Sequence, residues 1–322
     1  MKIKHNLLII LFILLSYSHL SAKNNYIRAK KIYGKNYVRL GDVANYYGMK
    51  LSFTSKTAYL TSQYSRILFT FAKRAGIING VKVNYLSAPV IDKGIPYIGQ
   101  KDFLILIDPI LRYKALRSQS IRTIVIDPGH GGKDNGAAGT KFKEKDIVLS
   151  FALKLRWLLR KNGYNAIVTR STDHFIPLDK RPELSTKYKA DLFISIHCNS
   201  ASEKVHGIET YFLTPEGEAS TRDIKPSYTK FSGNFWNRNN SRFAYEVHKS
   251  LIHKLKAEDR GIRHARFAVL KTLHCPGILI ETGYLSNSTD QNLLGNDSYQ
   301  NRLVNAIYEG IVRYQKNLQL AR

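Results

Sequence analysis

Residues 123–132 read TIVIDPGHGG, a β-branched run that ends in a glycine-rich turn containing a histidine. An apolar run of this kind, without polar alternation, is typical of a strand buried on both faces of a parallel sheet. Similar runs alternate with amphipathic stretches along the rest of the chain. The predicted strands cover 166–169, 191–196, 208–213 and 277–280, and the predicted helices cover 147–159, 242–256 and 299–315. The pattern predicts an α/β fold over residues 121–322, with a mainly parallel twisted sheet and helices on both faces.

Four polar side chains stand where predicted strands end or where the next helix begins. His130, His197 and Glu281 each follow a predicted strand, and Glu144 opens the helix after the glycine-rich turn. Because the carboxyl ends of parallel strands meet at one edge of a sheet, we expect these four side chains to converge. Two histidine nitrogens and one carboxylate form an open zinc site, in which zinc lowers the pKa of a water molecule to about 7. The remaining carboxylate then has a role as general acid and base.

Each of these residues also has a plainer interpretation. A single histidine at a strand end is more often a structural hydrogen-bonding residue, but two of them with two carboxylates at equivalent ends favour a metal site. The turn at 129–134 superficially resembles a phosphate-binding loop, but Asp134 stands where that loop needs Ser or Thr, so nucleotide binding is rejected. His197 beside Cys198 suggests a thiol nucleophile. Neighbours on a strand point to opposite faces, however, so Cys198 is expected to face away and be buried.

The other histidines, the cysteines and several charged residues receive structural interpretations. His174, His206, His248, His253, His264 and His274 are expected on the surface or in loops. Cys198 and Cys275 are too few for a disulfide framework or a four-thiolate zinc site, and a disulfide between them is a minor alternative to two buried thiols. Arg170, Asp173 and Arg181 fit either substrate contacts or salt-bridge scaffolding, of which scaffolding is favoured.

The region from 23 to 111 has a different pattern, in which apolar residues tend to alternate as in short strands. Asn79-Gly80 predicts a two-residue hairpin turn, and residues 41–47 predict a short capped helix. Residues 23–117 contain 17 basic and 4 acidic side chains. The region is therefore predicted to be a small mostly-β domain whose basic face is either simply solvated or an anchor for a wall polymer or partner.

Two further segments connect or interrupt these regions. Residues 112–120 are basic and polar and are predicted to be a linker. Residues 215–240 lack periodicity and are rich in Ser, Asn, Gly and Lys, so they predict a long surface loop. Such a loop either covers a substrate groove as a regulatory element or merely shapes it.

Residues 1–22 have the composition of a signal peptide. Lys2 and Lys4 precede an apolar run at 7–15, and small residues follow that run. Nine apolar residues are too few to span a bilayer as a helix, and no later segment is long and apolar enough either. The sequence therefore predicts an exported periplasmic or extracellular protein without an integral membrane segment after signal cleavage.

The charge of the chain limits its partners. Fifty Lys and Arg against 24 Asp and Glu give a net charge of +26, which predicts an anionic partner. In an exported protein this partner is expected to be a cell-envelope polymer and not nucleic acid.

Six sequence blocks resemble the type 3 family of zinc-dependent N-acetylmuramoyl-L-alanine amidases. The blocks are 123–132, 144–146, 169–173, Leu178 with Arg181, 195–199 and 276–287, and they cover about 122–314 in the family's order. The resemblance implies one zinc ion bound by His130, Glu144 and His197, with Glu281 as the catalytic carboxylate. The implied reaction is hydrolysis of the amide between N-acetylmuramic acid and the L-alanine of the stem peptide, so that peptidoglycan is the partner. Asn199 and Arg181 are predicted substrate contacts.

Weaker resemblances and alternatives complete these expectations. Residues 37–42, 78–80 and 94–100, the last of these before Phe103, weakly resemble the stalk domain named after the amine-oxidase N-terminus, with no copper site implied. The same metal chemistry also suits a zinc peptidase that cleaves within the stem peptide. A non-catalytic wall-binding regulator is a further alternative, although such a protein is expected to lose a ligand and this chain retains all four residues. A monomer is expected.

Overall fold

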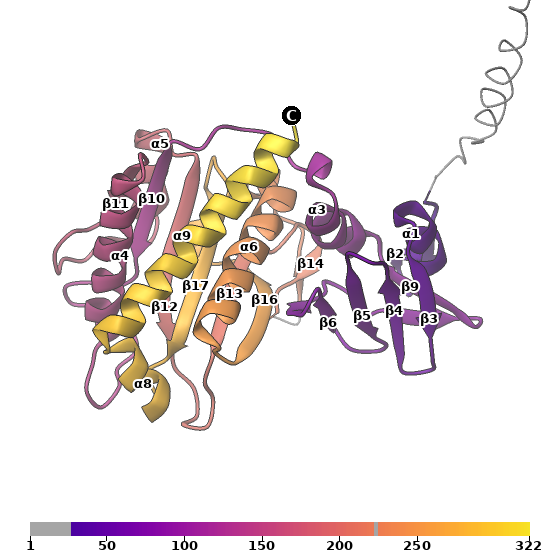
Figure 1. Ribbon diagram of the computed structural model, residues 1–322, viewed down its shortest axis with the longest axis horizontal. Coiled ribbons are helices and arrows are strands. Elements are labelled where there is room, and N and C mark those ends of the chain that lie inside the picture. Colours follow the sequence, from indigo (N-terminus) through magenta and orange to yellow (C-terminus); the bar gives the residue numbers. More distant parts are fainter. Residues whose placement is uncertain (1–26, 222–224) are drawn as a thin grey trace, which may run out of the picture.

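The computed structural model describes residues 27–221 and 225–322 (Figure 1). The predicted signal peptide at 1–22 lies outside the described residues, as does a short part of the predicted loop at 215–240. Within the described ranges, no helix combines the length and the apolar composition that crossing a bilayer requires.

Residues 121–322 form the predicted α/β arrangement. The strands lie in the order β11-β10-β12-β17-β13-β16, in which β11, β10, β12 and β17 are parallel and the adjacent β13 and β16 run the opposite way. Their bounds are β10 (Thr123–Pro128), β11 (Asn165–Val168), β12 (Leu192–Asn199), β13 (Ile208–Leu213), β16 (Asp259–Ala265) and β17 (Gly277–Tyr284). The mainly parallel sheet is confirmed, and β16 is an addition that the apolar pattern did not indicate.

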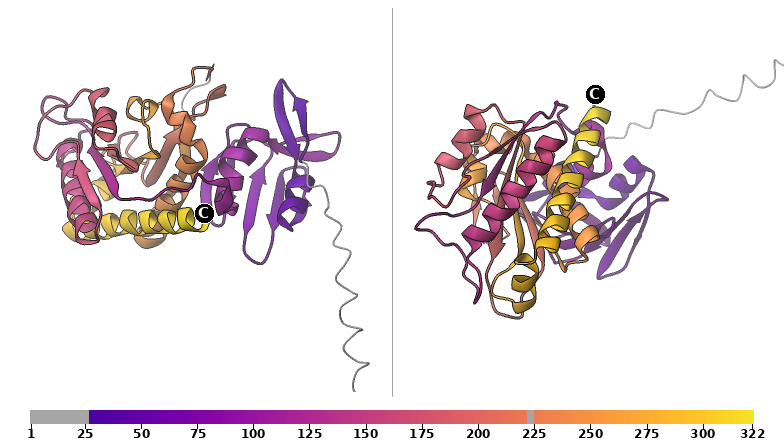
Figure 2. Two further views of the ribbon diagram at one scale, coloured as in Figure 1. Left: turned by 90° about the horizontal axis from the view of Figure 1, so that it is seen from above. Right: turned by 60° about the vertical axis from the view of Figure 1, so that its left-hand side comes forward.

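Helices cover both faces of this sheet, but unequally (Figure 2). Three long helices pack on one face: α4 (Glu144–Lys161), α6 (Asn237–Leu255) and α9 (Asp297–Leu320). The opposite face carries the short helices α5 (Lys180–Lys187) and α7 (Ala268–Lys271), and α8 (Ser288–Leu294) follows β17. The site described below opens on the face with the shorter helices.

Helix α4 shows how sequence determines local structure here. Its buried residues Ile147, Val148, Phe151, Leu155 and Leu159 recur at helical spacing and face the sheet. Acidic residues stand in its first turn and basic residues in its last turn, which complements the helix dipole. The helix therefore holds its first residue, Glu144, at a fixed place beside the strand ends.

The N-terminal region is mostly β, as predicted, with helices at its end. Its strands are β1 (Ala29–Ile32), β2 (Lys35–Arg39), β3 (Lys50–Phe53), β4 (Thr57–Thr61), β5 (Arg66–Thr70), β6 (Ala75–Ile78), β7 (Val81–Asn84), β8 (Val90–Asp92) and β9 (Ile95–Gly99). The predicted hairpin turn is confirmed: Asn79 and Gly80 have φ values of 49° and 83° and join β6 to β7. The predicted short helix is α1 (Leu40–Tyr47).

The end of this region is helical, which the sequence analysis did not predict. It contains α2 (Gln100–Asp102), η1 (Phe103–Ile107), α3 (Asp108–Leu111) and η2 (Tyr113–Ala115). Segments η1 and α3 pack against α6 of the second region. An apolar run with a proline does not by itself distinguish a short buried helix from a strand, and the contact with α6 favours the helix.

The two regions share one sheet and one core. Strand β7 pairs in parallel with β16, with Val83 opposite Ile262, so that β3–β7 extend the sheet to eleven strands. Strands β1, β2, β8 and β9 form a separate four-stranded sheet. One cluster of buried side chains runs from Val38 in the first region to Leu318 in the last helix. The predicted linker at 112–120 therefore joins two segments that fold against each other.

The segment predicted as a long loop at 215–240 is more ordered than expected. It contains β14 (Glu218–Ala219), β15 (Pro226–Ser227) and η3 (Ser232–Trp236), and α6 begins at Asn237, five residues before the predicted start. Arg74 of the first region donates hydrogen bonds to the Ala219 and Ser220 carbonyls. The segment follows β13, which runs opposite to β17, and so lies at the far end of the sheet from the ends of the parallel strands (Figure 1).

Two of the histidines expected at the surface are buried instead. His248 on α6 and His264 on β16 have no exposed area. His264 Nε2 lies 2.9 Å from an Nη atom of Arg74, and its Nδ1 lies 3.4 Å from Thr214 Oγ1. An imidazole with a partner for each nitrogen can be buried in the neutral form. Burial, together with the nearby charges of Arg74 and Arg266, lowers the pKa of His264 to about 3.

A core substitution in the first region should destabilise the whole protein. Ile107→Ala removes a fully buried side chain from η1, so we expect the free energy of unfolding to fall by about 2–5 kcal/mol. Both tryptophans, Trp157 and Trp236, lie in the second region, so tryptophan fluorescence reports on that region alone. Because the core is shared, the fluorescence transition in urea should shift with the substitution. Leu320→Ala, at a half-exposed position, is the control. An unshifted fluorescence transition in the Ile107 variant would contradict the shared core.

His264 should make the protein less stable as the pH falls. The unfolded chain binds a proton at this residue near pH 6.5 but the folded chain only near pH 3, so the contribution is present above about pH 6.5 and is lost as the pH falls through that window. Between pH 7.5 and 5.5 this amounts to about 1 kcal/mol. His264→Gln should remove that part of the pH dependence in urea unfolding, whereas His253→Gln, at an exposed position on α6, should leave it. Identical pH dependence in wild type and His264→Gln would refute this assignment.

Candidate metal centre

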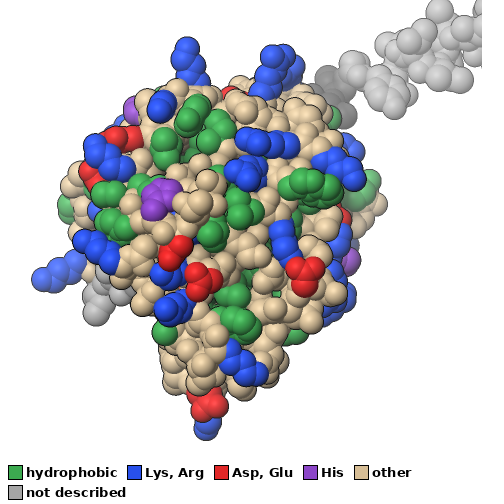
Figure 3. Space-filling model, turned by 90° about the vertical axis from the view of Figure 1, so that its left-hand side faces the viewer, with side chains coloured by type: hydrophobic (Ala, Val, Ile, Leu, Met, Phe, Trp, Pro, Cys, Tyr) green, Lys and Arg blue, Asp and Glu red, His purple; other side chains and the backbone are tan. Residues whose placement is uncertain are grey.

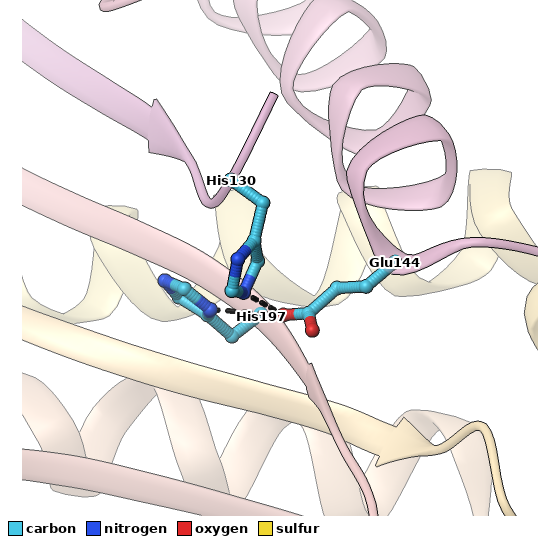
Figure 4. A group of neighbouring side chains, drawn as sticks. All are labelled: His130, Glu144 and His197. Carbon is cyan, nitrogen blue, oxygen red and sulfur yellow. Dashed lines mark hydrogen bonds and ion pairs between the residues drawn. The ribbon is translucent and has the colours of Figure 1, made fainter. Parts of the chain in front are cut away.

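The sheet brings the predicted residues to one edge. Strand β12 carries His197 and β17 carries Glu281, and these two residues are direct partners in the parallel register. His130 stands two residues beyond the end of β10, and Glu144 is the first residue of α4. Figure 4 shows His130, Glu144 and His197 pointing toward one another from three different elements.

One carboxylate oxygen is the centre of this group. Glu144 Oε1 lies 3.1 Å from His130 Nε2 and 2.9 Å from His197 Nδ1. One potential ligand atom from each of the three residues lies within 4.8 Å of the other two. The imidazole rings are 5.0 Å apart between centroids and nearly perpendicular. This is the donor set of an open zinc site.

Further hydrogen bonds orient the donor atoms. Asp134 Oδ2 lies 2.8 Å from His130 Nδ1, which fixes the ring and directs its Nε2 toward Glu144. The backbone N–H of Ala137 donates to Glu144 Oε2 at 2.7 Å, and that of Cys198 donates to Oε1 at 2.9 Å. A carboxylate partner on the outer nitrogen of a histidine is typical of metal-ligating histidines. This role of Asp134 was not predicted from the sequence, although its spacing of four residues from His130 could have indicated it.

Buried guanidinium groups hold the turn that carries His130. This residue has φ of 58°, a conformation that is uncommon outside glycine. Arg170 donates to the carbonyls of Pro128 and Gly129 at 3.2 and 2.7 Å, and Arg181 donates to the His130 carbonyl at 2.7 Å. These bonds restrain the turn from outside, so the histidine is held in its strained conformation.

The placement of Arg181 favours scaffolding over substrate contact. Its side chain is 2% exposed and forms a 2.9 Å ion pair with Asp127, whose own side chain has no exposed area. Thr169 and Ser195 also donate to Asp127, at 2.7 and 2.9 Å. A guanidinium enclosed in this way is not positioned to touch a substrate. The prediction of Arg181 as a substrate contact therefore does not fit its surroundings.

Two glycines leave the space that the donor side chains fill. A Cβ at Gly129 would lie 2.2 Å from the His197 ring, and a Cβ at Gly136 would lie 2.5 Å from Glu144 Oε2 and 2.6 Å from the His130 ring. Gly136 also has φ of +66°, which disfavours any other residue. The glycine-rich sequence around His130 is thus explained by packing against the donors.

The charges of the group are mutually stabilising. Burial would raise the pKa of Glu144, but hydrogen bonds from His130 and His197 outweigh it and lower the value to about 2. Burial would lower the pKa values of both histidines, but Glu144 raises them overall, with Asp134 adding to the effect at His130. A cation that binds here therefore displaces protons from the imidazoles and meets an ionised carboxylate.

Glu281 lies next to this group but outside it. It is largely buried, on the strand adjacent to His197 and on the same face of the sheet. Its negative charge contributes to the raised pKa of His197. Its antiparallel neighbour on β13 is Glu209, a buried carboxylate that the sequence analysis did not single out. Only the register of β13 against β17 reveals that pairing.

Asn199 and the cysteines occupy different surroundings. Asn199 Nδ2 lies 3.3 Å from both Glu209 Oε2 and the Tyr284 hydroxyl, and its predicted role in substrate binding stays a prediction. Cys198 is buried on the opposite face, near the Thr282 hydroxyl, as expected. Cys198 and Cys275 are both free thiols, so the disulfide alternative is wrong.

Comparison with known proteins identifies the family. Residues 124–313, more than half of the chain, match the family described as N-acetylmuramoyl-L-alanine amidase. The chain belongs to this amidase family. Its relatives include the uncharacterized protein YqiI of Bacillus subtilis, 36% identical over 194 residues that cover 60% of this chain and 84% of YqiI. The N-acetylmuramoyl-L-alanine amidase AmiA of Escherichia coli is 32% identical over 235 residues, covering 62% of this chain and 78% of AmiA.

Solved structures of related amidases share the fold. The catalytic domain of the amidase CwlV from Bacillus (Paenibacillus) polymyxa var. colistinus is 33% identical, with a TM-score of 0.52 over 61% of this chain and 99% of that domain. The amidase AmiC2 of Nostoc punctiforme is 32% identical, with the same TM-score over 62% of this chain and 99% of its own. The enzyme is therefore an N-acetylmuramoyl-L-alanine amidase, a hydrolase of cell-wall peptidoglycan.

Gly136→Ala in this amidase should disrupt the donor group. The added methyl group would collide with Glu144 and His130, so we expect at least a tenfold loss of zinc affinity, measured by competition with a chromophoric chelator. Gly163→Ala is a matched control: its φ is +85°, but a Cβ there meets nothing within 4 Å. Equal zinc affinity in the two variants would argue against the packing role of Gly136.

Proposed function

We propose that the amidase acts through one zinc ion held by His130, Glu144 and His197, with Glu281 as the general acid and base. The observation that carries this proposal is the convergence of two imidazole nitrogens on Glu144 Oε1 at 3.1 and 2.9 Å. The Asp134 contact and the glycine packing around the group fit a preformed ion site. Exposed acidic clusters often hold no ion, but Glu144 is buried at 2% exposure.

The proposed mechanism assigns separate roles to the metal ion and to Glu281. Zinc, when bound, supplies a Lewis acid and lowers the pKa of water to near 7. Glu281, on the neighbouring strand, accepts the proton of the attacking water and delivers it to the amide nitrogen of L-alanine as the bond to the lactyl carbonyl breaks. On the face of the sheet that carries the site, the short helices α5 and α7 are the packed neighbours.

The charge of the protein suits its substrate. The stem peptides of peptidoglycan carry free carboxylates, and the chain has a net charge of +26. Figure 3, which looks onto the β11 end of the sheet, shows Lys and Arg side chains spread over that face, with Asp and Glu between them. We also propose that the protein is exported by the segment at 1–22 and acts as a monomer in the periplasm or outside the cell.

Replacement of Glu281 should separate chemistry from metal binding. Glu281→Gln should lower kcat by about 10²- to 10⁴-fold and keep stoichiometric zinc, because the amide cannot accept the proton. His197→Ala should lose both zinc and activity. Activity is measured by mass spectrometry of products released from purified sacculi with and without chelator, and Glu309→Gln on α9 is the control. Native activity in Glu281→Gln would remove the proposed mechanism.

The same product analysis distinguishes the alternative functions. An amidase releases peptides that begin with alanine and leaves glycans free of peptide. A zinc peptidase would release fragments cut within the stem peptide. A wall-binding regulator would bind sacculi without releasing products, with no effect of chelator.

A further inference from the structure

A polar cluster next to Glu281 has no function in the mechanism above. Its centre is Glu209 on β13, which is 1% exposed. The hydroxyl groups of Tyr211 and Tyr284 donate to this carboxylate at 2.6 and 2.8 Å. Arg260 Nε lies 3.0 Å from Glu209 Oε1, and an Nη atom of Arg263 lies 3.3 Å from the same oxygen.

This cluster has more positive charge and more donors than Glu209 requires. Two guanidinium groups contact one carboxylate that already accepts two tyrosine hydroxyls, so Glu209 alone balances only one of the two positive charges. Arg260 Nε donates hydrogen bonds to Glu209 and to the Tyr284 hydroxyl. Its Nη atoms have no hydrogen bond to any residue in the described ranges. Its side chain is 29% exposed. A planar guanidinium with open donors suits a second carboxylate.

Strand register places this cluster on the same face as the metal centre. His197 pairs with Glu281, Glu281 pairs with Glu209, and Tyr211, two residues along from Glu209, pairs with Arg263. Residues paired in this way have side chains on one face, about 5 Å apart between neighbouring strands. The arginines therefore lie roughly two strands from Glu281, within the length of a short peptide.

A cleft begins at these arginines and extends toward the N-terminal region. Its volume is about 410 Å³, and Arg260 and Arg263 form one side. Residues of β5, β6 and β7 line the other side, including Thr70, Lys82 and Asn84. Two acidic residues also border the cleft, but Glu258 is paired with Lys82, and Asp259 accepts from backbone amides and lies 2.9 Å from His248. Positive charge thus remains at the arginine side.

We propose that Arg260 and Arg263 bind a free carboxylate of the stem peptide and so position the amide bond at the metal centre. The inference deepens the site assignment made above and rests on it. It also gives the N-terminal region a part in substrate binding, because β5–β7 form the far wall of the cleft. The recognised group is a peptide carboxylate held by a guanidinium fork.

Matched substrates test the proposal in the full-length mature enzyme. One synthetic N-acetylmuramoyl tripeptide has free carboxylates, and the other has them as carboxamides. A hydrogen bond to a charged group contributes about 1.5–3 kcal/mol, so the wild type should prefer the free acid by about 10- to 100-fold in kcat/KM. Equal rates on both substrates would overturn the proposal.

Variants of Arg260 and Arg263 test whether these residues cause the preference for the free-acid substrate. Arg260→Gln should raise KM for the free acid by a similar factor, with little change in kcat, and should leave the amidated substrate unaffected. Arg260→Lys should recover part of the loss, and Arg263→Gln provides a second test if the first variant folds poorly. Arg302→Gln, on the exposed side of α9, is the control for loss of a positive charge. An equal loss on both substrates would indicate a structural role instead.

Binding of the product peptide separates this proposal from the catalytic one. Calorimetry with the peptide that begins with L-alanine and carries free carboxylates needs no turnover. Weaker binding to Arg260→Gln than to wild type supports the carboxylate site even if the zinc mechanism fails. Equal affinity for wild type, Arg260→Gln and Arg263→Gln would reject it even if the zinc mechanism holds.

Discussion

The buried carboxylate of Glu144 is the interaction on which the site depends. A largely buried carboxylate needs compensation, and here two imidazoles and two backbone N–H groups supply it. Its position as the first residue of α4 adds the positive end of the helix dipole. Because these partners come from the loop after β10 and from β12, whereas Glu144 belongs to α4, the fold must bring all three segments together before the carboxylate is compensated. The two imidazoles that compensate the charge of Glu144 are therefore the same groups that are proposed to bind a metal ion with it.

The strained turn at His130 explains why the polar side chains of Arg170, Arg181 and Asp127 are buried beside it. A residue with φ of 58° keeps that conformation only where its neighbours determine it. Arg170 and Arg181 do so by binding successive carbonyls of the turn, and the ion pair between Arg181 and Asp127 anchors the second guanidinium in the core. These arginines act on the donor group through the backbone, not through the substrate.

The sequence predicted the parts of the structure that local pattern determines. The apolar strands, the hairpin at Asn79-Gly80 and the four residues at the strand ends follow from short motifs. Pairing between distant segments was not accessible, and so β16, with its polar Arg260, Arg263 and His264, was missed. The shared sheet depends on one such pairing, between Val83 and Ile262. The buried His264 was likewise misassigned because its partner Arg74 comes from the other region.

The pairing of β7 with β16 also affects the surroundings of two neighbouring carboxylates, Glu281 and Glu209. Glu281 and Glu209 are directly opposite on adjacent strands, an arrangement in which like charges repel. Arg260 and Arg263 on β16 form ion pairs with Glu209, which compensate its buried negative charge. Strand β16 is in turn supported on its outer side by β7 of the N-terminal region. The N-terminal region thus supports the strand that carries the two arginine partners of Glu209.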